Sequence, residues 1–121
     1  MPEASISMDV RVPVDAVAVI DIEGEITQFA EGVLQDAHDQ ATRKGATVVL
    51  LNFSGLDYMN SSGIGLLVTL LVRTQRNRQQ LGAFGLSEHY REIFQLTRLD
   101  EAIVIHSDEA TAIATTSGGT P

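Results

Sequence analysis

Two apolar runs of strand length, separated by an amphipathic helix, are the feature that most restricts the fold of this chain. The runs are AVAVIDI, residues 16–22, and ATVVLLNF, residues 46–53. Between them, over 28–44, the apolar residues fall on one helical face, and Gly45 follows as a stop signal. Strands that alternate with helices indicate an α/β layer structure whose crossovers are right-handed.

The rest of the chain continues this alternation. Residues 5–12 alternate apolar and polar side chains, which predicts a half-buried strand paired back on 16–22. The later elements expected are a helix over about 61–80, a strand over 82–86, a helix within 87–99 capped by Ser87, a strand over 102–106 and a helix over 107–114. The sequence therefore predicts one α/β domain over 1–114, a single mixed β-sheet of about five strands with about four helices. The tail, 115–121, has no large apolar residue and is expected to be disordered.

Charge and composition exclude several classes of function. The chain has 121 residues, 16 acidic against 8 basic, and a formal net charge of −8, which disfavours nucleic acid and direct binding to anionic membranes. It has no cysteine, and no apolar run approaches the roughly 18 to 20 residues that span a bilayer. A cytoplasmic protein is expected.

The segment YMNSSGIGLL, residues 58–67, places two serines where a strand and loop lead into a helix. Free backbone N–H groups and the positive end of the helix dipole gather there, so a phosphate on Ser61 is compatible with the fold. From spacing alone, a simple N-cap role for Asn60 or Ser61 is the more favoured interpretation.

The helix that follows carries a narrow stripe of polar and small residues. At about 100° per residue the stripe contains Ser62, Gly65, Thr69, Arg73 and Arg76, and Leu66 and Val72 flank it. Such a seam, starting at the serines, suits docking of a partner. The alternative is a helix that is simply buried on most sides.

The known catalytic serine and nucleotide motifs are absent. Neither serine lies in G-x-S-x-G, and the only lysine, Lys44, precedes Gly45 rather than Ser or Thr. The histidines His38, His89 and His106 lack metal-ligand spacing and are expected at the surface or at helix ends. We expect no catalytic residue, no metal and no cofactor.

Three segments together resemble a known family. VAVIDIEGEIT, TVVLLNFSGLDYMNSSGIGLL and GAFGLSEHYREIFQLTRLDEAIVIHSDEATAIA are similar, over about residues 6–114, to the STAS domain of bacterial anti-sigma factor antagonists. That family has a G-E-[LIV]-D segment after its second strand and a D-S-[ST]-G-[LIV]-G motif at its second helix. The first serine of that motif is the phosphoacceptor, which corresponds to Ser61.

The resemblance implies a non-enzymatic partner switch. The unphosphorylated protein would bind a serine-kinase anti-sigma factor, phosphorylation of Ser61 would end the complex, and a PP2C-type phosphatase would reset it. The partner-binding residues expected from the motifs and the stripe are Gly24, Glu25, Thr27, Asn60, Ser62, Gly63, Gly65, Leu66, Thr69, Val72 and Arg73.

Three positions depart from the family pattern, and two other functions stay open. Asn60, Asn52 and Thr27 stand where the family commonly has carboxylates. The alternatives are a non-phosphorylated STAS adaptor subunit of a larger assembly such as a lipid transporter, and a small-ligand or nucleotide sensor.

Overall fold

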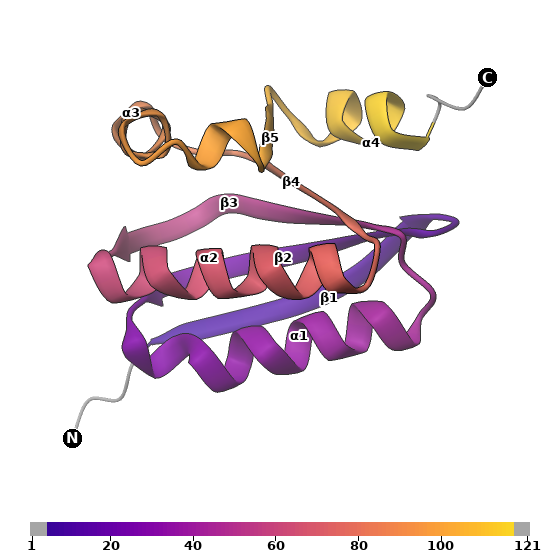
Figure 1. Cartoon of the computed structure of the whole chain (residues 1–121), viewed down its shortest axis with the longest axis horizontal. Helices are drawn as coiled ribbons and strands as arrows, with labels where there is room; N and C mark the ends of the chain where they lie inside the picture. The colour runs from indigo at the N-terminus through magenta and orange to yellow at the C-terminus, as the bar shows by residue number, and fades with distance from the viewer. Residues whose placement is uncertain (1–4, 118–121) are drawn as a thin grey trace.

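The computed structural model describes residues 5–117 and contains one five-stranded sheet in the order β1-β2-β3-β4-β5 (Figure 1). The strands are β1 (Ile6–Val14), β2 (Val17–Ile26), β3 (Val48–Met59), β4 (Gln80–Phe84) and β5 (Val104–His106). The helices are α1 (Glu31–Arg43), α2 (Ser61–Arg76), α3 (Glu88–Leu96) and α4 (Glu109–Ser117), with 3-10 turns η1 (Gln28–Ala30) and η2 (Leu99–Glu101). β1 pairs antiparallel with β2, and the other pairs are parallel. The predicted mixed-sheet α/β fold is confirmed.

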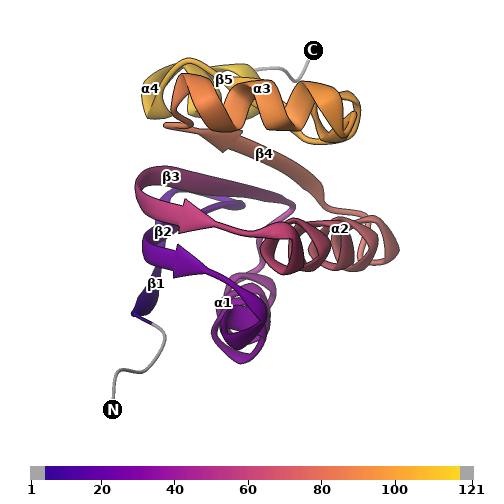
Figure 2. The same ribbon diagram turned by 90° about the vertical axis from the view of Figure 1, so that its left-hand side faces the viewer.

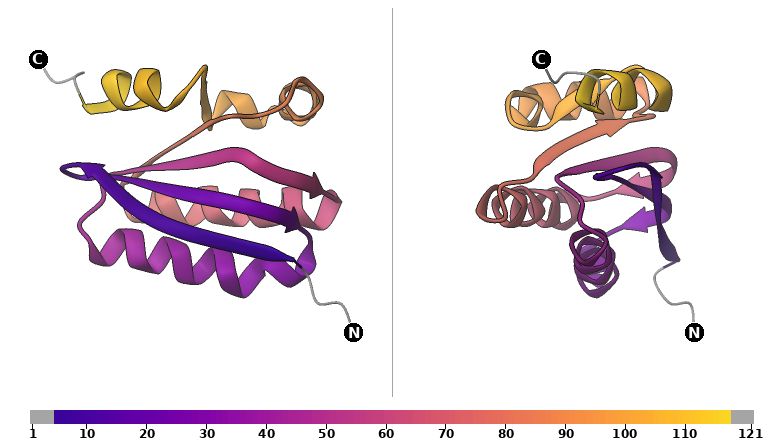
Figure 3. Two further views of the ribbon diagram at one scale, coloured as in Figure 1. Left: turned by 180° about the vertical axis from the view of Figure 1, so that it is seen from behind. Right: turned by 90° about the vertical axis from the view of Figure 1, so that its right-hand side faces the viewer.

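Two cores fill the faces of this sheet. The larger core contains alternate residues of β2 and β3 together with side chains of α1, α2 and α3. The smaller core contains Val17, Val19, Val48, Leu50, Phe84 and Ala112, the last from α4. Figure 2 shows α1 and α2 side by side next to β1–β3, with α3 and α4 gathered beside β4 and β5. Figure 3 shows from behind that β1 lies at one edge of the sheet and that α1 lies next to it.

β2 and β3 are both longer than the sequence predicts. β3 continues from Phe53 to Met59, so most of the segment expected as a loop is strand, and β2 continues to Ile26. The two extensions pair in parallel, from Glu23 opposite Gly55 to Ile26 opposite Met59, with one register shift just before Glu23 and a second between Gly24 and Glu25. A glycine suits position 55 because a Cβ there would lie 2.8 Å from the Ile22 carbonyl oxygen. Turn-type residues therefore form a bulged strand here.

The structure differs from two further expectations, both for elements late in the chain. α2 ends at Arg76 and β4 begins at Gln80, a residue that the sequence assigns to the helix. α4 continues through Ser117, so residues 115–117 are helical rather than disordered, and the Thr116 hydroxyl donates to the Ala112 carbonyl. The remainder of the expected tail, 118–121, lies outside the described residues.

Two of the three histidines are buried, which corrects the expectation of surface positions. His38 in α1 contacts Gln79 through Nε2, 2.7 Å from Oε1, and Gln79 Nε2 donates to Thr42 and to the Ala46 carbonyl. His106 in β5 packs beside Gly82, where a Cβ would lie 3.3 Å from its Nε2. Burial without an acidic partner lowers the pKa of His106.

Arg11 ties β1, β2 and α4 together. Its guanidinium donates to both Asp21 carboxylate oxygens and, at 2.9 and 3.1 Å, to the Glu109 carboxylate. Asn52 Nδ2 donates to Asp21 Oδ1 at 2.8 Å, so the amide at this position is a hydrogen-bond partner of a neighbouring carboxylate. The Arg11 guanidinium holds the pKa of Asp21 below its usual range; burial opposes this shift, and the Asn52 bond assists it.

The first turn of α2 is packed against the end of β2. The Asn60 N–H donates to the Ile26 carbonyl at 3.3 Å, and a Cβ on Gly63 would lie 2.3 Å from the same carbonyl oxygen. Two residues later, the position of a Cβ on Gly65 has no neighbouring atom within 4 Å. Gly63 is therefore required by the fold, whereas Gly65 is not.

The Arg11 cluster gives the first prediction. Arg11→Met should lower the free energy of unfolding at pH 7 by about 1 kcal/mol, because part of the side chain is exposed to solvent. The pKa of Asp21 is depressed in the folded state, so the stability it contributes is present above the unfolded value and lost as pH falls through the folded value. Urea unfolding should therefore show the gap between variant and wild type narrowing below about pH 4.

Arg98→Met is the matched control, because the 3.9 Å ion pair of Arg98 with Glu101 is far more exposed. It should change the unfolding free energy by less than about 0.5 kcal/mol. Equal losses in both variants would contradict the role given to Arg11.

The two glycines of α2 give the second prediction. Gly63→Ala should destabilise the domain by about 1 to 3 kcal/mol through overlap with the Ile26 carbonyl. Gly65→Ala should stabilise it by about 0.5 to 1 kcal/mol, because the helix gains a better former and the methyl group meets no atom. Denaturant unfolding of the pair checks both signs, and destabilisation by Gly65→Ala would show that the open space is filled.

Candidate functional site

Ser61 is the first residue of α2 and is free to react. Asn60 is the N-cap, and its Oδ1 accepts from the Gly63 N–H at 3.0 Å, which confirms the capping role proposed for that residue. Both serine side chains are exposed, and neither hydroxyl makes a hydrogen bond within residues 5–117. Because Asn60 caps the helix, Ser61 can change chemically without loss of the cap.

The start of α2 favours a negative charge at Ser61 through its backbone, although its first turn has no charged side chain. No acidic or basic residue lies among the first four residues of α2, and the basic residues Arg73 and Arg76 are in the last turn. The backbone N–H groups of Ser61 and Ser62 precede the first intrahelical bonds, and the helix dipole is positive here.

The end of β2 lies beside this helix start, because Ile26 pairs with Met59. Thr27 caps η1, its Oγ1 accepting from the Phe29 N–H at 3.3 Å. Glu25 is exposed, and its N–H donates to the Ser5 carbonyl. Gly24 is buried within β2 at a φ of +107°, where a Cβ would lie 1.9 Å from the Ser5 carbonyl oxygen, so glycine is needed there for the backbone of the strand.

α3 holds the same edge from the other side. The Met59 N–H donates to the Tyr90 hydroxyl at 2.9 Å, one residue before the cap of α2. No local pattern predicts this bond, because it depends on where α3 packs. Tyr90 therefore helps to fix the junction between β3 and α2, where Ser61 lies.

The predicted stripe on α2 is mostly exposed. Ser62, Gly65, Thr69 and Val72 face solvent, Leu66 is half-buried, and Gly63 is buried against β2. The Thr69 hydroxyl donates to the Gly65 carbonyl, and Arg73 forms an ion pair with Asp39 of α1 at 3.3 Å. This face of α2 is therefore exposed, which contradicts the alternative of a helix that is simply buried on most sides.

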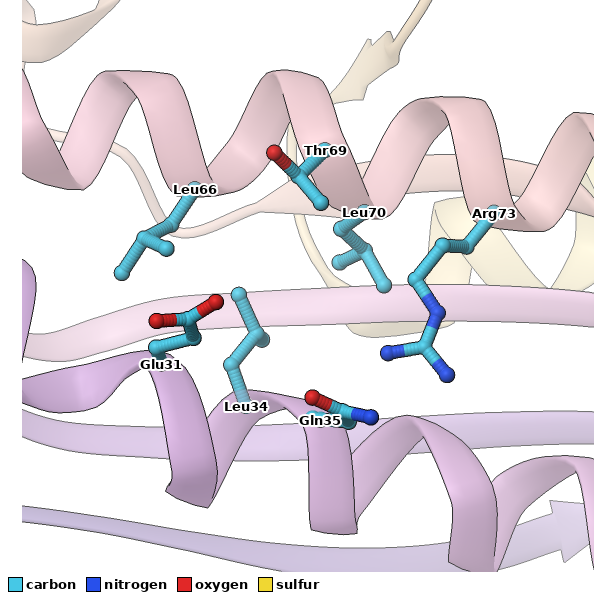
Figure 4. Close-up of a pocket in the computed structure, with 7 residues that line it drawn as sticks. All are labelled: Glu31, Leu34, Gln35, Leu66, Thr69, Leu70 and Arg73. Carbon is cyan, nitrogen blue, oxygen red and sulfur yellow. The ribbon is translucent and has the colours of Figure 1, made fainter.

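A shallow groove separates this face from α1. Figure 4 shows Leu66, Thr69, Leu70 and Arg73 of α2 opposite Glu31, Leu34 and Gln35 of α1. The floor is apolar, with Leu34 and Leu70 buried, and the rim is polar. Its volume of about 30 Å³ is far below that of a typical small-molecule site, so the groove suits surface contact with a macromolecule better than a ligand.

Two residues that the sequence places on the apolar faces of the helices predicted over 28–44 and 61–80, Phe29 and Val68, are exposed at the site. Val68, assigned outside the stripe, is 44% exposed, close to the 40% of Val72 one turn later. Phe29 in η1 is 70% exposed. The exposure of Val68 could be predicted from spacing, because Val68 lies three residues after Gly65. The exposure of Phe29 could not, because it depends on how η1 turns.

Two features of catalytic sites, a base beside the serines and a metal-binding cluster, were sought among residues 5–117. A nucleophilic serine needs a base within hydrogen-bond reach, and no described side chain bonds to Ser61 or Ser62. Residues 5–117 contain no group of three or more His, Asp or Glu side chains arranged to hold a metal. No helix within the same range is long and apolar enough to cross a membrane.

Known proteins match this chain in sequence. The anti-sigma-B factor antagonist of Staphylococcus aureus (strain NCTC 8325 / PS 47) is 24% identical over 94 residues, 78% of this chain and 85% of the relative. The protein of the same name from Staphylococcus epidermidis is 27% identical over the same shares.

Solved structures match the fold. An anti-sigma factor antagonist from Mycobacterium paratuberculosis gives a TM-score of 0.77 at 19% identity, covering 96% of this chain and 97% of that one. The anti-sigma factor antagonist SpoIIAA in its unphosphorylated form gives 0.71 at 18% identity, covering 94% and 100%. Bacillus SpoIIAA in the phosphorylated form gives 0.67 at 20%, covering 88% and 96%.

The family model decides the assignment, because it spans most of the sheet and all three helices of the larger core. The model described as STAS domain matches residues 7–112, from β1 into α4. With the predicted motifs, the five-stranded mixed sheet and the helix that starts at Ser61 in agreement, this chain belongs to the STAS domain family.

Proposed function

We propose that this protein is a cytoplasmic anti-sigma factor antagonist that works by partner switching. Unphosphorylated, it binds a serine-kinase anti-sigma factor and so frees the sigma factor. The kinase transfers the γ-phosphate of its ATP to the Ser61 hydroxyl, which ends the complex, and a PP2C-type phosphatase removes the phosphate. The observation that carries the proposal is an exposed, unbonded Ser61 on a helix that Asn60 already caps.

The relatives support the regulatory part of this proposal. Proteins named anti-sigma-B factor antagonist match 78% of this chain and most of their own length. One structural neighbour, SpoIIAA, is described in a phosphorylated and an unphosphorylated form. A phosphate switch is therefore compatible with this fold.

The exposed face of α2 supports the binding part. Gly65 leaves open space on a helix where alanine would be more stable, so its lack of a side chain serves something other than folding. Val68, Thr69 and Val72 continue this face away from Ser61. A partner that lies along α2 would contact Ser61 and these residues together.

Phosphorylation would act on the complex more than on the fold. A phosphoserine adds about −1.5 to −2 charges, which the start of α2 accepts through its dipole and free N–H groups. Within the first turn there is no Lys or Arg to neutralise it. Covering such a charge in a closely packed interface removes its hydration, which costs several kcal/mol, so the partner would be released.

The switch gives the third prediction. Incubation with the cognate kinase and ATP should place phosphate on Ser61, which mass spectrometry can map. Ser61→Asp should keep the wild-type melting temperature but bind the kinase at least about tenfold more weakly, because one carboxylate imitates a phosphate only in part. Ser61→Ala should fold, bind the kinase and resist release by ATP.

Ser62→Ala is the control, because Ser62 is equally exposed and adjacent. It should be phosphorylated and released like the wild type. Phosphate found mainly on Ser62 or Ser54 would overturn the assignment. If ATP released the complex of Ser61→Ala as well, the switch would not depend on Ser61, and a non-phosphorylated STAS adaptor would become the better proposal.

The face of α2 gives the fourth prediction. Thr69→Arg should weaken kinase binding by more than about 1 to 2 kcal/mol, because a long cation would stand at the centre of the contact. Gln95→Arg, an equally exposed change of the same charge on α3, should bind within about twofold of wild type. Calorimetry measures binding, and urea unfolding shows whether both variants are folded. Equal effects from both changes would remove α2 from the interface.

A further inference from the structure

Phe29 is exposed to an extent that packing does not explain. It is 70% exposed, whereas Phe53, Phe84 and Phe94 are all buried. An aromatic ring left in water forgoes the free energy that burial would supply, and aromatic residues are enriched where proteins bind one another. A function outside the monomer is the natural explanation for such a ring.

A structural role at the start of α1 does not account for this ring. Ala30 is the N-cap of α1, so Phe29 stands one residue before it, where a hydrophobic staple would pack against Leu34, the fourth helical residue. Leu34 is buried in the core, yet most of the Phe29 side chain stays in solvent. The staple, if it forms at all, uses only a minor part of the ring.

The turn that carries Phe29 is nevertheless well held. The Phe29 N–H donates to Thr27 Oγ1, and the Ala30 N–H donates to the Thr27 carbonyl at 3.0 Å. η1 contacts α2, and the Ile26 carbonyl lies directly under Gly63 in the first turn of that helix. Phe29 is therefore presented by a fixed backbone turn that contacts α2, the helix that begins at Ser61. A ring on a fixed backbone loses little entropy on binding.

The surroundings of Phe29 are acidic. Glu25 precedes it on β2, and Glu31 follows it as the first residue of α1 and lines the groove toward α2 (Figure 4). Both carboxylates are exposed, and neither forms an ion pair with a described residue. A binding pocket that faces this site must accept an aromatic ring and tolerate two negative charges.

We propose that Phe29 is the anchor of the kinase interface, inserting into an apolar pocket of the serine-kinase partner whose rim carries Lys or Arg opposite Glu25 and Glu31. This inference rests on the proposed function and adds to it the chemistry of the partner's surface. The turn that carries the anchor contacts α2, the helix that begins at Ser61, so a phosphate there would act on the same interface.

The test measures the affinity of the serine kinase that phosphorylates Ser61. Phe29→Ala should weaken binding at least about 30-fold, the scale of a buried aromatic anchor, and Phe29→Leu should recover part of the loss. Leu96→Ala is the matched control, because Leu96 is 81% exposed at the far end of α3, and it should bind within about twofold of wild type. All three variants should unfold like the wild type, since both side chains are exposed.

The association rate tests the proposed cationic rim of the partner's pocket. Glu31→Lys should slow association about tenfold at low salt, and the difference should shrink at high salt, where screening weakens steering. A slowing that is unaffected by salt would contradict a cationic rim.

The remaining outcomes separate the two proposals. If Phe29→Ala binds within about threefold of wild type while Thr69→Arg does not bind, the partner switch stands and the anchor is wrong. If Leu96→Ala loses as much affinity as Phe29→Ala, the interface lies elsewhere and the anchor is wrong. If the wild type binds no serine kinase, both proposals fail.

Discussion

The parallel pairing of β2 with β3, continued to Ile26 and Met59, is the constraint on which the rest of the site depends. Parallel strands end at the same edge of a sheet, so the turn after β2 and the helix after β3 start side by side. The Ile26 carbonyl then accepts from Asn60 and lies against Gly63, which sets the first turn of α2 on the end of β2. Without the last four residues of each strand, η1 and Ser61 would not share one surface.

The sequence predicts the order and type of the elements because their apolar periods are strong. It misplaces the ends of β2 and β3, since Gly55 and its neighbours have turn chemistry and become strand only through pairing with Glu23–Ile26. The burial of His38 depends on Gln79, 41 residues away in the chain, and no local pattern encodes it. Ser61 is found by its motif, whereas Phe29 and Tyr90 need the tertiary structure.

The neutral residue at position 52 has a physical reason in this chain. The family commonly places an aspartate there, but here Asp21 lies beside it on β2, and Asn52 Nδ2 donates to that carboxylate while Asn52 Oδ1 accepts from the Ser54 N–H. A second carboxylate 2.8 Å from Asp21 would meet like charge, and Arg11 is already shared with Glu109. The amide satisfies both neighbours without adding charge.

Asn60 is a neutral N-cap next to Ser61, so it changes the electrostatics of a phosphate on that serine. A carboxylate at the cap would stand next to a phosphoserine at Ser61 and repel it, whereas the Asn60 amide caps Gly63 without charge. A phosphate on Ser61 therefore meets less charge repulsion within the monomer. More of its free-energy cost then arises in the complex, where a partner packs against α2. With Glu25 and Glu31 unpaired nearby, such a surface must supply cations to bind the unphosphorylated form. Those cations would also attract a phosphate. Release of the partner therefore requires either a steric clash between the phosphate and the partner, or a desolvation cost of the phosphate that exceeds its attraction to the cations.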